Sequence, residues 1–263
     1  MGRSEAGARA KWGGAKQDYS LTPFPRCVSH LTSRYRYCSG LIFDQIRATM
    51  NSVAGAGNYI LEKASIDELY LDVTSYCDVS SAGDETPPDV PEDTKYVVIG
   101  GKGEGEGGGN KNLPKRLGWA AYVVEKVRKD VKEKVGFTMS AGVSKNKTMA
   151  KLSASHCKPD GLAVLPPSSV DVMLRTTKMI KVRNFGGKLG KKVIEAVVNE
   201  RGGGDTGEDD IFMRDVGAIS VDNLRHRHGF GNDTAMWLFR LMNRGDEDEE
   251  VEMTKVRGSE GWS

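Results

Sequence analysis

Residues 59–74 read YILEKASIDELYLDVT, and this stretch contains the sharpest local feature of the sequence. Apolar and polar side chains alternate along 69–74, which is the period of a half-buried β-strand. The stretch 59–63 predicts a partner strand, and the segment SIDE at 65–68 lies between the two. The sequence therefore predicts a β-hairpin that carries two adjacent carboxylates, Asp67 and Glu68, near its tip.

The Asp67-Glu68 pair has two interpretations on residue types alone. Neighbouring side chains on a flat strand point to opposite faces, whereas at a hairpin tip both can converge on one point. Two such oxygen ligands suit Mg²⁺, which fills its other positions with water and substrate phosphates. A solvated turn is the commoner origin of an Asp-Glu dipeptide, so the metal-site hypothesis depends on the rest of the chain.

The elements around the hairpin predict an α+β domain. Apolar residues recur at helical spacing over 39–51 and again between Pro114 and Gly136. A strand at FTMSAGVS (137–144), a helix over 146–157 and a short strand at 162–165 follow. This order predicts an antiparallel sheet with helices on one face.

Residues 78–112 differ from their surroundings because they are rich in glycine, proline and acidic residues. This composition predicts a disordered insertion in the sheet domain. Within it, GEGEGG at 103–108 matches a dinucleotide-binding pattern. The match lacks a helix directly after it, and its glutamates would repel a pyrophosphate, so we interpret it as flexible loop.

A separate all-α domain is expected from residue 175 onward. Seven basic residues and no acidic one lie between Arg175 and Lys192, around the segment FGGKLG. Successive backbone N–H groups of a glycine-rich turn can hold a phosphate. A plain helix connection with solvated lysines explains the residue types equally well. The acidic run DEDEE at 246–250 is expected to be solvated.

The overall composition excludes several classes of protein. The 263 residues hold 38 basic and 36 acidic side chains, a net charge of +2, which excludes a histone-like polycation. The four cysteines form no Cys-x-x-Cys pair, so neither a zinc module nor a disulfide scaffold is expected. No apolar run is long enough for a membrane span, and the start lacks a secretory signal, so we expect an intracellular protein without membrane contact.

Four strings together resemble the Y-family of translesion DNA polymerases, in that family's order. ASIDELYLDVT is similar to the family's catalytic hairpin, and RYRYCS (34–39) resembles the opening of a palm helix. Residues 140–161, SAGVSKNKTMAKLSASHCKPDG, resemble the next palm strand and helix. Residues 179–197, MIKVRNFGGKLGKKVIEAV, resemble the start of the thumb.

The resemblance implies roles for particular residues. Asp67 and Glu68 would bind two catalytic Mg²⁺ ions, with Mn²⁺ as an alternative, and Lys158 would contact the triphosphate of the incoming nucleotide. Arg9, in the string RAKWGGAK (9–16), resembles the arginine that touches the incoming base. A helix-hairpin-helix would bind DNA through Gly187, Lys188, Leu189, Gly190, Lys191 and Lys192.

The implied function is template-directed DNA synthesis past lesions. The partners would be primer–template DNA and deoxynucleoside triphosphates, with replication or repair proteins in addition, and the expected location is the nucleus. Residues 1–34 are left unassigned, with a remnant of the fingers as one interpretation; the expected domains after them are a palm (35–174) with the insertion 78–112, a helical thumb (175–250) and a linker (251–263).

Departures from the family pattern keep two other functions open. No palm strand with a further metal-binding aspartate is recognisable before Asp67, and no little-finger domain follows the thumb. The chain therefore looks like a fragment of a larger polymerase. The alternative is a non-catalytic DNA-binding module with a relic palm. A nucleotidyl-cyclase-like enzyme is a third reading, and the basic hairpin argues against it.

Overall fold

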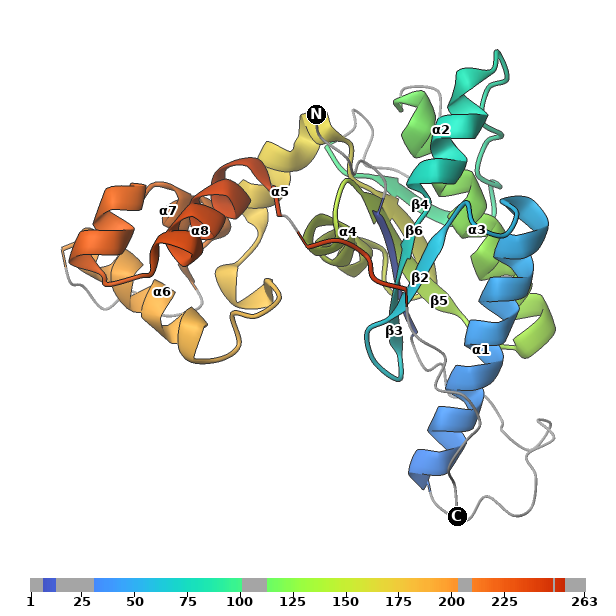
Figure 1. The fold of residues 1–263 in the computed structure, drawn as a ribbon, viewed down its shortest axis with the longest axis horizontal. Coiled ribbons are helices and arrows are strands. Elements are labelled where there is room, and N and C mark those ends of the chain that lie inside the picture. The colour runs from blue at the N-terminus through green and yellow to red at the C-terminus, as the bar shows by residue number, and fades with distance from the viewer. Residues whose placement is uncertain (1–6, 13–30, 101–112, 203–209, 248, 254–263) are drawn as a thin grey trace.

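The computed structural model describes residues 7–12, 31–100, 113–202, 210–247 and 249–253, without the side chains of 7–12, Leu31 and Thr32. A sheet domain is followed by a helical domain (Figure 1). The strands of the sheet domain are β1 (Gly7–Trp12), β2 (Ile60–Lys63), β3 (Glu68–Asp72), β4 (Lys95–Val98), β5 (Met139–Ser144) and β6 (Gly161–Val164). Its helices are α1 (Leu31–Val53), α2 (Thr74–Ala82), α3 (Lys115–Val135) and α4 (Lys147–Ala154). The helical domain contains α5 (Val170–Thr176), α6 (Lys188–Glu200), α7 (Met213–Gly217) and α8 (Asn232–Arg244).

The predicted hairpin and the main helices are confirmed. β2 and β3 pair antiparallel, with Leu61 opposite Leu71. Helix α1 contains the predicted 39–51, and α3 ends at Gly136, whose φ of 79° is the left-handed conformation that glycine adopts most easily. The α+β class with a following helical domain is therefore confirmed.

The sheet is mixed, whereas an antiparallel one was predicted. Its strand order is β2-β3-β1-β5-β6-β4, with antiparallel pairs from β2 to β5 and parallel pairs from β5 to β4. The physical reason is connectivity, because β5 reaches β6 through α4, and a helical crossover returns the chain in the same direction.

Helices cover both faces of the sheet, whereas the sequence predicted one. Figure 1 shows α1, α2 and α3 on one face and α4 on the other, toward the helical domain. Accordingly Leu162 and Val164 belong to the core with α1 and α3, while Ala163 joins the core that continues into the helical domain. Helix α4 lies directly on β5 at Gly142, where a Cβ would come within 2.1 Å of the Ala150 carbonyl oxygen.

Residues 7–12 lie in the segment interpreted as a fingers remnant, and for them this interpretation is wrong. They form β1, which lies between β3 and β5 in the middle of the sheet. The short string GARAKW has no long apolar run, so only pairing with two distant strands makes it a strand. The rest of 1–30 lies outside the described residues.

The insertion predicted at 78–112 is wrong in part. Residues 78–82 complete α2, and 95–98 form β4 at the edge of the sheet. Tyr96 is buried in the core, as is Val90. The average composition of the segment hid the short apolar run KYVVI. The GEGEGG pattern lies outside the described residues.

The helical domain begins earlier than residue 175. Val170, Met173 and Leu174 of α5 are buried in the same core as α6, α7 and α8. Short 3₁₀ or π turns complete the fold at Ser155–Cys157, Pro167–Ser169, Met179–Lys181 and Asn223–Arg227. In the described part of the chain, no helix combines the length and apolar character needed to cross a bilayer.

Candidate active site

Asp67 is held at the tip of the hairpin by its neighbour Ser65. The Ser65 hydroxyl donates to Asp67 Oδ1 at 2.6 Å and accepts the Asp67 backbone N–H at 3.2 Å. The N–H groups of Ala64 and Ser65 both donate to the Glu68 carbonyl, which closes the turn. Ser65 therefore shapes the hairpin and fixes one carboxylate oxygen of Asp67.

Glu68 begins β3 and is paired with a cation. Its side chain is 15% exposed, and Lys151 Nζ of α4 lies 3.6 Å from Glu68 Oε2. An ammonium group thus stands beside the carboxylate where the sequence predicted a metal. Two carboxylates are suitable ligands for one Mg²⁺ together with water and phosphate oxygens.

A site for two Mg²⁺ ions requires more ligands than the carboxylates of Asp67 and Glu68. Two Mg²⁺ ions about 4 Å apart need a carboxylate that bridges them. In the described residues no group of three or more His, Cys, Asp or Glu side chains is placed to hold a metal. Strand β1, which faces Glu68 through Lys11, contributes no acidic residue. The described residues therefore lack the third ligand that a two-ion site needs, and binding of an ion by Asp67 and Glu68 stays a prediction.

The fold brings the loop of Lys158 and the carboxylates to the same end of the strands of the sheet. Glu68 pairs with Lys11, Lys11 pairs with Ser140, and Ser140 is level with Gly161 in the parallel β5–β6 register. Three strand spacings separate Glu68 from Gly161, about 14 Å. The side chain of Lys158, three residues before Gly161, is exposed.

Arg9 lies in β1, where its backbone is opposite Tyr70 on one side and Gly142 on the other. Its side chain is outside the described part of the structure. A contact between Arg9 and an incoming base stays a prediction.

The basic segment at the start of α6 forms a tight turn. Gly187 precedes the helix, and Gly190 lies so close to the turn that a Cβ there would come within 1.8 Å of the Phe185 carbonyl oxygen. No acidic residue lies in the first turn of α6. No acidic side chain therefore offsets the positive end of the helix dipole at the start of α6, and this charge favours a bound anion.

The side chains of this segment have different surroundings. Lys188 and Lys191 are exposed, whereas Leu189 packs against the core of the helical domain. Lys192 Nζ donates to the Gly229 carbonyl at 2.6 Å and lies 4.4 Å from the centre of the Phe230 ring. Lys192 therefore joins the turn before α6 to the turn at Gly229 and Phe230 that precedes α8. The sequence did not predict this contact.

Comparisons with known proteins identify the family to which this fold is similar. Residues 28–155 match the impB/mucB/samB family, whose members form the Y-family. The chain carries a Y-family domain. DNA polymerase eta of Arabidopsis thaliana is 28% identical over 242 residues, which are 82% of this chain and 34% of that protein. DNA polymerase IV of Ralstonia nicotianae is 32% identical over 203 residues, 76% of this chain and 41% of that protein.

The Y-family fold is also found by structure. A solved structure described as the insertion ternary complex of Dbh DNA polymerase has a TM-score of 0.52 and 22% identity, and the match covers 84% of this chain and 47% of that one. The chain thus spans between a third and a half of the length of these relatives.

The acidic segment after α8 was mispredicted from the sequence. Residues 246–252, which we call the acidic return segment, leave α8 and run back to the sheet domain, as Figure 1 shows in red. Glu247 accepts the backbone N–H of Thr148 at 2.7 Å and its hydroxyl at 2.5 Å, at the start of α4. The Glu252 N–H donates to Glu62 Oε2 at 2.7 Å. Glu247 of the acidic run is therefore bound to protein rather than solvated, whereas Glu250 is exposed.

Lys147 lies at the centre of these contacts. Its side chain is 2% exposed, and its Nζ lies 2.7 Å from Glu62 and 3.2 Å from Glu249. A buried ammonium needs such partners, because an unpaired charge in the interior is strongly unfavourable. The partners are distant in sequence, so no local pattern signalled them.

Proposed function

We propose that this chain supplies the palm and thumb of a translesion DNA polymerase that adds deoxynucleotides to a primer. In this reaction the primer 3′-hydroxyl oxygen attacks the α-phosphorus of the nucleotide and pyrophosphate leaves. The observation that supports the proposal is that Asp67, Glu68 and the loop of Lys158 lie at the same end of the strands of the sheet.

Each residue has a task in the proposal. Asp67 and Glu68 hold a Mg²⁺ ion, which when bound activates the 3′-hydroxyl and balances the charge of the phosphates. Lys158 presents its ammonium to the triphosphate, and the turn 186–192 binds the DNA backbone without reading sequence. A DNA substrate places the protein, and any replication or repair partners, in the compartment that holds DNA, the nucleus in a eukaryotic cell.

A second function is favoured by the carboxylate count. Strand β1 brings Lys11 rather than an acid opposite Glu68, and the described residues offer no third ligand. A chain that grips duplex DNA through the thumb and holds a palm without a complete two-ion site would act as a DNA-binding module. Binding of a nucleotide separates the two functions, because the module needs none.

The experiment measures binding of dATP to the chain in the presence of primer–template, with Mg²⁺ and with EDTA. Mg²⁺-dependent binding is expected in the wild type and should be lost in Asp67→Asn. Asp72→Asn is the matched control, because Asp72 lies on the same strand but accepts the Thr74 N–H at 2.8 Å, a role that asparagine also fills. DNA binding with no nucleotide binding would support the module instead.

A further inference from the structure

The loop formed by residues 157–161, here the Lys158 loop, is held by three elements of the sheet domain. Lys95 Nζ, at the start of β4, donates to the Lys158 carbonyl at 2.9 Å. The Cys157 thiol donates to the Ala141 carbonyl of β5 at 3.3 Å. Side chains of α3 reach Asp160 from a third direction. The loop backbone is therefore fixed against the sheet.

Asp160 is the anchor on the α3 side. Its Oδ1 accepts a hydrogen bond from Arg128 Nη2 at 2.9 Å, and its Oδ2 accepts one from Lys132 Nζ at 3.0 Å. Asp160 also has a φ of 47°, a left-handed conformation that is unfavourable for most residues. The two charge-assisted hydrogen bonds hold the residue in that conformation.

Arg128 is itself oriented from every side. Its side chain is only 6% exposed, its Nε donates to the Met139 carbonyl at 2.8 Å, and its Nη1 is paired with Glu125. Glu125 in turn accepts the Thr94 hydroxyl at 2.8 Å. A planar guanidinium with this many fixed partners has one orientation and offers Nη2 at one place.

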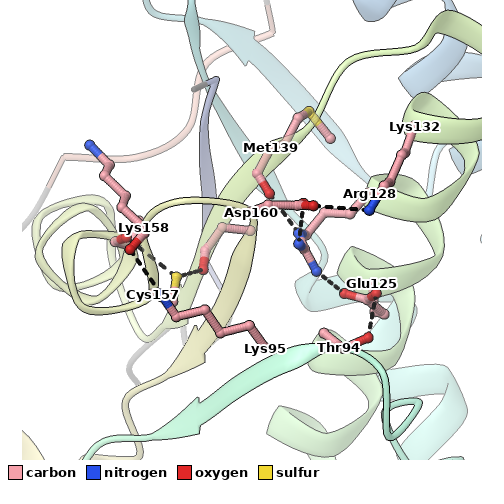
Figure 2. A network of polar contacts seen from close by, with 11 residues as sticks. Thr94, Lys95, Glu125, Arg128, Lys132, Met139, Cys157, Lys158 and Asp160 are labelled. Carbon is pink, nitrogen blue, oxygen red and sulfur yellow. Dashed lines mark hydrogen bonds and ion pairs between the residues drawn. The ribbon is translucent and has the colours of Figure 1, made fainter. Parts of the chain in front are cut away.

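The anchored side of the loop and the lysine lie opposite each other. Figure 2 shows Arg128, Asp160 and Lys132 gathered on one side of the loop, while the Nζ of Lys158 extends away from them on the other. The loop also packs closely on itself, because a Cβ at Gly161 would come within 2.3 Å of the Cys157 carbonyl oxygen.

We propose that Arg128 and Asp160 form a positioning pair that sets the place of Lys158 against the triphosphate of the nucleotide. The pair touches no substrate and acts through the backbone of the Lys158 loop. This inference rests on the proposed function, in which Lys158 binds the triphosphate.

The test is a double-mutant cycle on binding of Mg²⁺-dATP to the full chain with primer–template. Asp160→Asn is suited to it, because asparagine tolerates a positive φ while losing the charge that holds Arg128 and Lys132. We expect Asp160→Asn and Lys158→Ala each to weaken binding about tenfold, the effect of one charge-assisted hydrogen bond. The double variant should bind no more weakly than Lys158→Ala alone, because the pair acts only through Lys158.

The sign of the effect separates positioning from simple charge. Removing a negative charge near a triphosphate strengthens binding by electrostatics alone, whereas the proposed positioning predicts weaker binding. Glu133→Gln is the matched control, since Glu133 is an exposed carboxylate at the same end of α3 that pairs with Lys129 rather than with the loop. It should bind the nucleotide as the wild type does or slightly more tightly.

Each outcome decides the matter. If Lys158→Ala weakens binding while Asp160→Asn does not, or if the two effects add in the double variant, the positioning role is wrong and the proposed function stands. If the wild type binds no nucleotide, or Lys158→Ala has no effect, the nucleotide site of the proposed function fails and the positioning role falls with it. Should Asp160→Asn fail to fold, Lys132→Gln against Lys129→Gln repeats the comparison, with weaker binding expected only in the first.

Discussion

Arg183 of the helical domain and Glu249 of the acidic return segment form a two-point ion pair, with Arg183 Nη1 2.8 Å from each carboxylate oxygen. Glu249 also lies 3.2 Å from Lys147 of α4. Burial works to raise the pKa of Glu249, but hydrogen bonds from Arg183 and Lys147 outweigh it and hold the pKa below its ordinary value. One carboxylate therefore links the helical domain to the sheet domain.

Glu249→Gln is expected to lower the free energy of unfolding by about 1 kcal/mol, the upper end for partly exposed ion pairs. A carboxyl whose folded pKa is lowered contributes stability above its unfolded value near 4.5 and loses it as the pH falls through the folded value. The difference from wild type in urea denaturation should thus shrink below pH 4.5. Exposed Glu250→Gln is the control, and an equal effect there would contradict the assignment.

The turn before α6 should bind duplex DNA through phosphates. Lys188→Ala and Lys191→Ala are each expected to weaken binding to unrelated duplexes equally, and each should reduce the slope of log K against log salt by about 1. Titrations of the full chain at several salt concentrations measure both. Lys129→Ala on α3 removes an exposed lysine outside the turn and should leave the slope unchanged.

Position 11 of β1, whose backbone lies opposite Glu68, is expected to control metal binding by the palm. Directly opposite residues of an antiparallel pair have Cβ atoms about 5 Å apart, so Lys11→Asp would place a third carboxylate beside Glu68. We expect Mn²⁺ affinity, measured by electron paramagnetic resonance of the free ion, to rise about tenfold over Lys11→Asn, which loses the same positive charge without adding a ligand.

The same count predicts that the wild-type chain shows no measurable primer extension. Asp67→Asn should leave its binding to primer–template nearly unchanged, because the thumb contacts the duplex without the carboxylates. Clear extension by the wild type would show that two carboxylates suffice, and a matching loss of DNA binding in Asp67→Asn would contradict the metal role.

Strand β4 should be needed for stability, contrary to the sequence-based expectation that 78–112 is a disordered insertion. Tyr96 is 7% exposed in the core, so Tyr96→Ala is expected to lower the free energy of unfolding by about 3 kcal/mol. Val79→Ala, at a side chain 70% exposed, should change it by less than about 0.5 kcal/mol. Similar small effects at both positions in chemical denaturation would restore the disordered-insertion view.

Buried thiols should make the protein less stable in alkali. Burial raises the pKa of Cys77 to about 12 and that of Cys157 to about 11, from an ordinary 9.0. Thiols with raised folded values favour the folded state fully below pH 9 and lose that contribution as the pH rises toward the folded values. The free energy of unfolding, measured by urea denaturation between pH 9 and 11, should fall less steeply with pH in Cys157→Ala, by about 1.4 kcal/mol per pH unit, and identical slopes would contradict burial of the thiol.

Elements with a local signal could be predicted from the amino-acid sequence. The alternation in LYLDVT predicted β3 with Asp67 and Glu68 at the tip, and the apolar stripe before Gly136 predicted α3. The string around Asp67 lies within residues 28–155, which match the family, whereas Lys158 and Gly187 lie beyond that match. Each of these signals is complete within about twenty neighbouring residues, where backbone geometry dictates the pattern.

Contacts between residues far apart in the sequence could be identified only from the tertiary structure. GARAKW becomes an inner strand because β3 and β5 pair with it on both sides, and KYVV becomes β4 because it pairs with the outer side of β6. Glu68 and the Lys158 loop reach the same end of the strands through the register of three strand pairs, and Glu249 finds Arg183 across 66 residues of chain. Such contacts depend on the closure of long loops and the burial of charges, which no local period of the sequence encodes.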